Sequence, residues 1–258
     1  MDLHLKGRFF LVTGASSGLG KAITGQLVQE GAEVLAIARN QDKLDELVAE
    51  YGSYVQTMAA DVTDRKFLSL LGLKLDARIP DGVLVNAGGP PAGGFFDTDL
   101  NLWDEAYQNV LLWKVSLLKY LIPLFKSRGS GRVVMIESIS VKQPVQDLIL
   151  SNAFRPAVVG MAKTLASEVA KDGITINILA PGYHDTSAMQ RLYQKKSLKT
   201  GHSVEHVKKL FIQETETGHL GVAADFAQMA AWLLSPASAF VTGQVISVAG
   251  NQIKGLWG

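Results

Sequence analysis

Three glycines near the start of the chain have the spacing of a loop that binds a diphosphate. They are Gly14, Gly18 and Gly20 in LVTGASSGLGKA, where an apolar run precedes the loop and a helix-forming run follows it. Glycines allow a tight turn that presents backbone N–H groups, and the positive end of the next helix attracts an anion. The G-x-x-x-G-x-G spacing differs from the general G-x-G-x-x-G fingerprint, so a turn without a ligand is the alternative. The strand, loop and helix in this order favour a dinucleotide site.

Charged residues after the next two strand-like runs indicate which dinucleotide binds. In AIARN, Ala38 and Arg39 stand where an acidic residue would hold both ribose hydroxyls of the adenosine and repel a 2′-phosphate. A guanidinium can instead bind that phosphate, so we expect NADP(H) in preference to NAD(H). The alternative is an arginine that only faces solvent. Asp61, in ADVTD, can accept from the adenine amino group or cap a helix.

Short apolar runs alternate with helix-like segments along nearly the whole chain. The runs are RFFLVT, AEVLAIA, YVQTMAA, GVLVNAG, GRVVMIES, TINILAPG and GQVISVAG. Strands that are apolar on both faces are typical of a parallel sheet between helical layers, and segments such as LGKAITGQLVQEGA can form the crossover helices. We predict one doubly wound, Rossmann-like α/β domain over residues 1–258, with a mainly parallel seven-stranded sheet and helices on both faces.

The stretch from residue 186 to residue 221 departs from this alternation. It is polar and helix-prone, and we expect a lid-like helical excursion over one end of the sheet. Its basic residues could attract an anionic substrate or an acidic carrier protein, although the solvated face of surface helices is the favoured interpretation. These residues are Arg191, Lys195, Lys196, Lys199, Lys208 and Lys209.

The composition excludes several classes of protein. Hydrophobic residues make up 47% of the chain and charged residues 19%, which is enough for a core and gives no sign of disorder. A net charge of +1 gives no electrostatic reason to expect nucleic acid or an anionic membrane as partner. The chain contains no cysteine, so disulfides, thiolate catalysis and cysteine metal sites are excluded, and we expect no metal.

The apolar stretches do not read as targeting or membrane segments. The first residues, MDLHLKGRFFLVTG, lack the apolar run and cleavage site of a signal peptide. The longest apolar stretch, VLLWKVSLLKYLIPLF, is interrupted by Lys114, Lys119 and Pro123 and is too short and too charged to span a bilayer. We therefore expect a cytoplasmic protein.

Several short motifs follow one another in a familiar order. They are TGASSGLG, VNAG (85–88), IES (136–138), AKTLASE (162–168), NILAPGYHDT (177–186) and VTGQVISVAG (241–250). Together they resemble the short-chain dehydrogenase/reductase family across essentially the whole chain, and within it the 3-oxoacyl-acyl-carrier-protein reductases and similar carbonyl reductases. The resemblance implies an oxidoreductase acting on a small carbonyl compound or alcohol, or on an acyl thioester.

The resemblance also implies roles for individual residues. Ser138 matches the serine that hydrogen-bonds the substrate oxygen, and Asn109 matches the helix asparagine that holds a proton-relay water. The segment from Asn86 to Gly88 matches the one that passes the adenosine ribose, and Pro181, Gly182 and Thr186 match the loop that fixes the nicotinamide. The complete set assigned to the cofactor is Gly14, Ser16, Ser17, Gly18, Leu19, Gly20, Arg39, Asp61, Val62, Asn86, Ala87, Gly88, Arg155, Pro181, Gly182 and Thr186.

The two catalytic residues of the family are both replaced in this chain. The tyrosine and lysine of Y-x-x-x-K fall on Ser151 and Arg155. A serine hydroxyl is shorter and much less acidic than a phenol, and arginine stays protonated, so it is a poor proton shuttle that can still donate to the nicotinamide ribose. Pro156 removes a helical N–H and disfavours helical geometry at Arg155, so we expect an irregular helix at these positions.

Two hypotheses follow for the function. The first is an NADP(H)-dependent reductase or dehydrogenase with an altered proton donor, and the second is a cofactor-binding protein that acts as a sensor or structural partner. Other proton donors near the site are Lys142, Tyr183 and His184, for which solvation, packing and a surface position are the respective alternatives. A flavin or methyl-donor site is less favoured. The wide apolar arcs of the helices from Asn101 and Ser151 predict a homotetramer or homodimer.

Overall fold

A seven-stranded sheet forms the centre of the molecule. A computed structural model describes residues 2–76 and 78–256, and its strand order is β3-β2-β1-β4-β5-β6-β7, with all neighbouring strands parallel. This confirms the predicted Rossmann-like α/β fold. The strands are β1 (Phe9–Thr13), β2 (Glu33–Ala38), β3 (Val55–Ala59), β4 (Gly82–Val85), β5 (Gly131–Ile136), β6 (Ile174–Pro181) and β7 (Val245–Val248).

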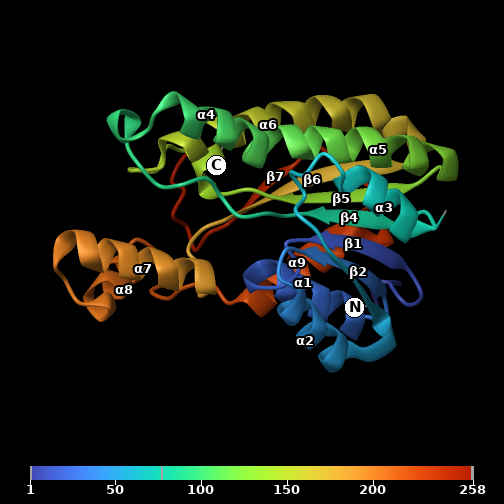
Figure 1. Ribbon diagram of the computed structural model, residues 1–258, viewed down its shortest axis with the longest axis horizontal. Coiled ribbons are helices and arrows are strands. Elements are labelled where there is room, and N and C mark those ends of the chain that lie inside the picture. Colours follow the sequence, from blue (N-terminus) through green and yellow to red (C-terminus); the bar gives the residue numbers. More distant parts are fainter. Residues whose placement is uncertain (1, 77, 257–258) are drawn as a thin grey trace.

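Helices cover both faces of the sheet because successive strand residues are buried on opposite sides. Phe9 and Leu11 of β1 belong to the hydrophobic core shared with α3 (Phe67–Leu75), α5 (Trp113–Arg128) and α6 (Ile149–Val169). Phe10 and Val12 belong to the core shared with α1 (Gly18–Gln29), α2 (Gln41–Tyr51) and α9 (Ala223–Leu234). Figure 1 shows α5 and α6 on one side of the sheet and α1, α2 and α9 on the other. Both helical layers exclude water from the faces of the sheet. Polar side chains that bind a ligand are therefore expected at the ends of the strands.

Local signals mark the ends of several helices. The side chain of Asn40 accepts from Lys43 N at 2.9 Å at the start of α2, and Asp99 caps α4 (Leu100–Ala106) in the same way. Gly129, with a φ of 72°, ends α5 in the left-handed conformation that glycine adopts without strain. A π-helical turn, Tyr107–Leu112, joins α4 to α5.

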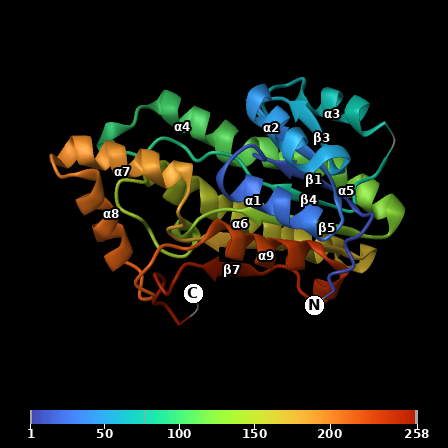
Figure 2. The ribbon, with the colours of Figure 1, turned by 90° about the horizontal axis from the view of Figure 1, so that it is seen from below.

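The predicted excursion forms two helices, α7 (Ser187–Thr200) and α8 (Val204–Gln213). They pack on each other through a small cluster of their own that contains Tyr193, Val207, Phe211 and Leu220. Figures 1 and 2 show them standing apart from the helices that cover the sheet. Within the described residues, no helix is both long enough and apolar enough to cross a membrane.

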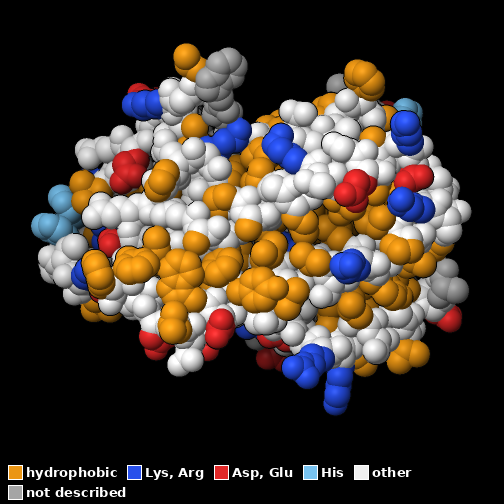
Figure 3. Space-filling view, turned by 90° about the horizontal axis from the view of Figure 1, so that it is seen from above, with side chains coloured by type: hydrophobic (Ala, Val, Ile, Leu, Met, Phe, Trp, Pro, Cys, Tyr) orange, Lys and Arg blue, Asp and Glu red, His pale blue; other side chains and the backbone are white. Residues whose placement is uncertain are grey.

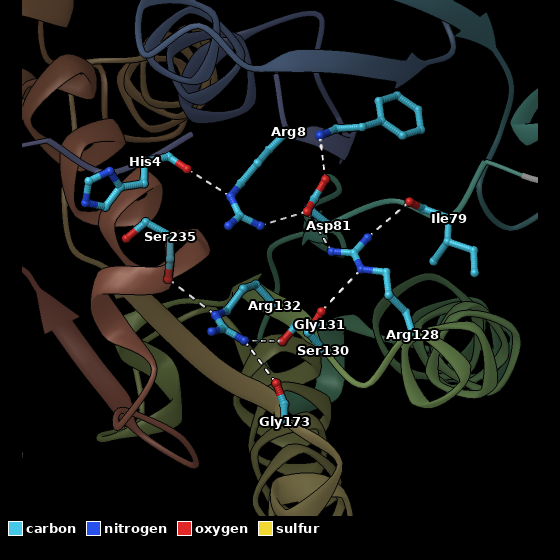
Figure 4. A network of polar contacts seen from close by, with 11 residues as sticks. His4, Arg8, Ile79, Asp81, Arg128, Ser130, Gly131, Arg132, Gly173 and Ser235 are labelled. Carbon is cyan, nitrogen blue, oxygen red and sulfur yellow. Dashed lines mark hydrogen bonds and ion pairs between the residues drawn. The ribbon is translucent and has the colours of Figure 1, made fainter. Parts of the chain in front are cut away.

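An arginine network ties together the amino ends of the central strands. Asp81 accepts from Arg8 Nη1 at 2.9 Å, from Arg128 Nη2 at 2.6 Å and from the backbone of Phe9 at 2.8 Å (Figure 4). Arg132, beside this network, donates to the backbone carbonyls of Gly131, Gly173 and Ser235. These charge-assisted hydrogen bonds hold the amino ends of the strands together. The carboxyl ends of the strands remain available to a ligand.

The expected irregularity around Pro156 is wrong. α6 runs without a break from Ile149 to Val169 with Pro156 inside it. Pro156 is exposed, so its missing N–H lies on the side of the helix that solvent can reach. Ser151 and Arg155 therefore sit one regular turn apart.

Candidate active site

The glycine loop forms a cradle that any side chain would fill. A Cβ on Gly20 would lie 2.1 Å from the carbonyl oxygen of Gly14, and a Cβ on Gly14 would lie 2.8 Å from the carbonyl oxygen of Asn86. Gly14 and Gly18 also have φ values of 62° and 54°, which favour glycine. The loop lies at the carboxyl end of β1, between β2 and β4, where the strand order reverses. Open-sheet proteins bind nucleotides at this point, so the loop fits the diphosphate of a dinucleotide.

Asn86 connects this loop to the end of β4. Its backbone N–H donates to Thr13 Oγ1 at 2.8 Å, and the Thr13 hydroxyl donates back to the Asn86 carbonyl at 2.8 Å. Its side chain reaches the Gly14 carbonyl at 3.5 Å. These bonds hold Asn86 beside the loop.

Arg39 and Asp61 meet at the ends of β2 and β3. Arg39 Nη1 lies 3.8 Å from Asp61 Oδ2, and the Arg39 side chain is 80% exposed. Asp61 Oδ1 accepts from the backbone and hydroxyl of Thr63 at 2.9 and 2.7 Å, which closes a local turn; the next helix, α3, begins at Phe67, so Asp61 does not cap it. Partial burial acts to raise the pKa of Asp61, but the bonds from Thr63 and the charge of Arg39 outweigh it and lower the pKa. The exposed Arg39 side chain can thus reach a phosphate at the end of β2, while the lowered pKa keeps Asp61 ionised.

The loop after β6 closes against the glycine loop. A Cβ on Gly18 would lie 3.6 Å from Thr186 Cβ, and the Thr186 hydroxyl caps α7 by accepting from Met189 N at 3.5 Å. Gly182 is packed so tightly against the Gln252 side chain that a Cβ would lie 1.9 Å from its Oε1. Pro181, Gly182 and Thr186 are therefore gathered on the same side as the glycine cradle.

Three serine hydroxyls lie between the end of β5 and the first turn of α6. Ser138 Oγ accepts from the backbone of Ser140 at 3.2 Å, and Ser140 Oγ lies 3.3 Å from Ser151 Oγ. Ser140 and Ser151 are buried, while Ser138 is partly exposed. Ser138 is consequently the hydroxyl of the three that an incoming substrate can reach first.

A buried chain of charges continues from Ser151. Arg155 Nε donates to Ser151 Oγ at 2.8 Å, and Arg155 Nη1 donates to Glu137 Oε2 at 2.9 Å. The other oxygen of Glu137 forms an ion pair with Lys114 Nζ. Lys114, Glu137 and Arg155 are only 3%, 4% and 9% exposed. One carboxylate therefore holds two cations that come from α5 and α6.

The electrostatics of this cluster are unbalanced in favour of positive charge. Burial lowers the pKa of Lys114, the ion pair with Glu137 acts against that shift, and the nearby Arg155 charge adds to it. A Cβ on Gly89 would lie 2.9 Å from Arg155 Nη2, so the guanidinium faces the loop that follows Asn86. Arg155 Nη2 can thus donate toward a ribose, while Nε and Nη1 are held by Ser151 and Glu137.

Comparison with known proteins identifies the family. The family model described as enoyl-(acyl carrier protein) reductase matches residues 14–250. The chain belongs to the short-chain dehydrogenase/reductase family. Nodulation protein G of Rhizobium sp. (strain N33) is 31% identical over 253 residues, covering 96% of this chain and 98% of that protein.

Further relatives agree with this assignment. Dehydrogenase/reductase SDR family member 4 of Oryctolagus cuniculus is 29% identical and covers 96% of this chain and 94% of its own length. The structure of L-sorbose reductase from Gluconobacter frateurii, solved with NADPH and L-sorbose, superposes with a TM-score of 0.92 at 25% identity, over 99% of this chain and 100% of that one. The fold and the family are therefore shown.

The sequence pointed to Ser138, Ser151 and Arg155 but missed their charged partners in this short-chain dehydrogenase/reductase. Glu137 is the middle residue of the IES motif, and Lys114 is visible in the sequence only as an interruption of an apolar stretch. A lysine within a strongly apolar helix is itself a signal, because lysine is almost never fully buried unless it is paired. That signal could have prompted a search for a buried carboxylate.

The other candidates for proton transfer lie in different surroundings. Asn109 is exposed within the π-helical turn, and its carbonyl accepts from the Trp113 indole at 3.0 Å. Tyr183 packs against Phe211 with ring centroids 4.7 Å apart. Its hydroxyl donates to Glu214 at 2.8 Å, while burial first and then this carboxylate raise its pKa.

The surface interpretation of His184 is wrong. This side chain is 5% exposed, and its ring lies edge-on to Phe226 with centroids 5.1 Å apart. Burial lowers its pKa, so it is held neutral by its surroundings. In the described part of the chain, no group of His, Asp and Glu side chains is arranged to hold a metal ion.

Proposed function

We propose that this protein is an NADP(H)-dependent oxidoreductase that interconverts the carbonyl and alcohol forms of a small molecule. The family membership and the glycine cradle support a nicotinamide cofactor. The exposed Arg39 at the end of β2 and the NADPH bound to L-sorbose reductase support the phosphorylated form. When bound, the cofactor supplies or accepts the hydride, and the chain must manage the charge and the proton on the substrate oxygen.

The bond from Arg155 to Ser151 carries the proposal of an atypical proton donor. Because Arg155 Nε occupies a lone pair of Ser151 Oγ, the hydroxyl proton of Ser151 is directed away from Arg155. In our proposal Ser138 donates a hydrogen bond to the substrate oxygen and Ser151 supplies the proton. The guanidinium stabilises the serine oxygen as it loses that proton, as a lysine does for the tyrosine elsewhere in the family. Water then restores the proton.

One observation favours the second candidate, a cofactor-binding protein with little or no turnover. Glu137 neutralises the charge on one edge of Arg155, which weakens the field available to acidify Ser151. A serine hydroxyl is also a far weaker acid than a phenol. Under this alternative, the site would bind cofactor as a sensor or as a partner of an active relative.

Kinetics with one matched variant separates the two candidates. Purified protein is mixed with NADPH and a panel of ketones and 3-oxoacyl thioesters, and the absorbance of the reduced cofactor is followed. We expect turnover by the unaltered protein and a fall in kcat of about a hundredfold or more for Ser151→Ala, with the Kd for NADPH unchanged. Ser167→Ala, an exposed serine on the same helix, is the control. Binding of NADPH without any turnover would instead establish the second candidate.

We also propose that the chain assembles with copies of itself as a dimer or tetramer. Phe95, Phe96, Leu100 and Tyr107 are all exposed in and around α4, and Phe96 is 97% exposed. Figure 3 shows hydrophobic side chains gathered on the face that α4, α5 and α6 form. Apolar patches of this kind mark interaction surfaces on soluble proteins. Sedimentation measurements would show a monomer if the proposal is wrong.

A further inference from the structure

We infer that the substrate of this enzyme is a neutral polyhydroxylated carbonyl compound, such as an open-chain ketose, and not an acyl thioester or another anion. The inference rests on the proposed reductase function and specifies its substrate class. It is carried by the lining of a pocket whose wall includes Ile139, the residue after Ser138.

The pocket lies at the carboxyl ends of β5, β6 and β7. It encloses about 370 Å³, which suits a small ligand. Its wall includes Ile139, which directly follows Ser138, and Tyr183, which follows the Gly182 turn. A molecule seated there would therefore contact Ile139 and Tyr183, the residues that follow Ser138 and Gly182 in the chain.

Neutral amides dominate the polar lining. Gln143, Gln146, Gln213 and Gln252 all border the pocket, and each amide carries both donors and an acceptor. That combination matches a hydroxyl group, which also donates and accepts. An aliphatic acyl chain would instead need a continuous apolar wall, and among the residues that the structure describes the apolar lining consists of Ile139, Pro144 and Val145 beside the aromatic ring of Tyr183.

Internal hydrogen bonds fix part of this amide wall and leave complementary groups available. Gln143 Nε2 donates to the Gln252 carbonyl at 3.3 Å, which leaves Gln143 Oε1 as an acceptor. Gln252 Oε1 accepts from the backbone of Tyr183 at 3.0 Å, which leaves Gln252 Nε2 as a donor. Groups held in this way recognise a ligand at a low entropic cost.

The charges of the lining disfavour an anionic substrate. Glu214 and Glu216 both border the pocket, and Lys254, which also borders it, is paired with Glu216 at 2.5 Å. The basic residues of α7 and α8 do not lie in this lining. Lys208 pairs with Asp185 at 3.7 Å, and Lys196 lies over the Phe211 ring at 4.7 Å. A phosphorylated substrate or an acidic carrier would meet like charge here.

A matched pair of ketones tests the inference. Erythrulose and 2-butanone share a four-carbon chain with the carbonyl at the second carbon, and they differ only in hydroxyl groups. We expect kcat/KM with NADPH to be at least tenfold higher for erythrulose than for 2-butanone or for acetoacetyl-N-acetylcysteamine. Reduction of 2-butanone or the thioester with equal or greater efficiency would overturn the inference and leave the proposed reductase function intact.

Variants of the amide wall provide a second measurement. Gln146→Leu and Gln213→Leu should each raise the KM for erythrulose about tenfold, with the Kd for NADPH unchanged, whereas Gln29→Leu, an exposed residue on α1, should change neither value. An unchanged KM in both pocket variants would contradict the inference.

If no carbonyl compound is reduced, the proposed function fails and binding still tests the pocket. Saturation-transfer NMR on the protein with NADP⁺ should then detect erythritol, with the signal lost in the doubly substituted Gln146→Leu/Gln213→Leu protein. No signal with the unaltered protein, or an equal signal with the variant, would overturn the inference as well.

Discussion

Arg155 donates from Nε to Ser151 Oγ at 2.8 Å, and these are the two positions that we predict to match the catalytic lysine and tyrosine of short-chain dehydrogenases. The bond exists because α6 is regular there, so that residues four apart share one face. The opposite edge of the guanidinium rests on Glu137, which also holds Lys114. The two replacements are therefore parts of one buried cluster, and the cluster has to be considered as a unit.

Removing the buried ion pair should loosen Arg155 and slow turnover. In Lys114→Met/Glu137→Gln one positive and one negative charge disappear together, so the net charge of the cluster is unchanged while Arg155 loses its carboxylate partner. We expect kcat to fall about tenfold or more, because Arg155 no longer fixes Ser151 when its carboxylate anchor is gone. The KM for the carbonyl substrate should change little.

The matched control removes an exposed pair from the same helix. Lys126 of α5 and Asp172 pair at 3.0 Å, and both side chains are more than a third exposed. Lys126→Met/Asp172→Asn should cost less than about 1 kcal/mol of stability and leave kcat unchanged. Equal effects in the two double variants would show that Glu137 has a structural role only.

Restoring the tyrosine and lysine of the family should not by itself restore a fast enzyme. In Ser151→Tyr/Arg155→Lys, the new ammonium would pair with Glu137, which cancels much of the field that lowers the pKa of a neighbouring phenol. We expect the quadruple variant that adds Lys114→Met/Glu137→Gln to have the higher kcat. The rates of NADPH oxidation by the two variants are compared. A double variant as fast as the quadruple one would show that Glu137 does not weaken the field that acts on the phenol.

Gly20→Ala should abolish tight cofactor binding. The new Cβ would overlap the Gly14 carbonyl at 2.1 Å, and the backbone of the loop would have to shift by more than 1 Å to reach ordinary contact distance. Calorimetry should show the Kd for NADPH raised at least tenfold. Gly160→Ala is the matched control, because a Cβ there meets nothing within 4 Å, and in a helix this change should stabilise the fold by up to about 1 kcal/mol.

Arg39→Ser should remove the preference for the phosphorylated cofactor. A charge-assisted hydrogen bond is worth about 1.5–3 kcal/mol, so we expect the Kd for NADPH to rise roughly 10- to 100-fold. The Kd for NADH, measured on the same variant, should stay within a factor of a few and serves as the internal control. Equal losses for both cofactors would contradict a contact with the 2′-phosphate.

Lys114 should leave a signature in the dependence of stability on pH. Its pKa in the folded protein is lowered from 10.5, mainly by burial. Between the folded and unfolded pKa values the unfolded chain binds more protons, so the contribution of Lys114 to the free energy of unfolding rises with pH, by up to about 1.4 kcal/mol per pH unit. At pH values below both the folded and the unfolded pKa, the buried charge of Lys114 lowers the free energy of unfolding by its full amount.

Urea unfolding at several alkaline pH values measures this contribution. The free energy of unfolding of the unaltered protein, minus that of Lys114→Met, should increase as pH rises toward 10.5. Tyrosines that ionise in the same range are present in both proteins and cancel in the difference. A flat or falling difference would show that the pKa of Lys114 is not lowered.

The sequence by itself determined the fold, the family and the shape of the glycine loop. Runs such as RFFLVT form strands because their apolar residues are β-branched or aromatic and continuous, and this information is local. The glycine spacing at Gly14, Gly18 and Gly20 specifies a backbone shape that few other residues can adopt, so it too can be read without a structure.

Only the tertiary structure decided the chemistry around Ser151. Lys114 and Arg155 lie 23 and 18 residues from Glu137, and they meet it because α5 and α6 pack on the same face of the sheet beside β5. The conformational preferences of Pro156 and the residue before it predict a broken helix, yet α6 is continuous in the folded chain. Side-chain pairing across elements depends on helix positions and rotamers that no short stretch of sequence encodes, so these contacts become visible only when the elements are assembled.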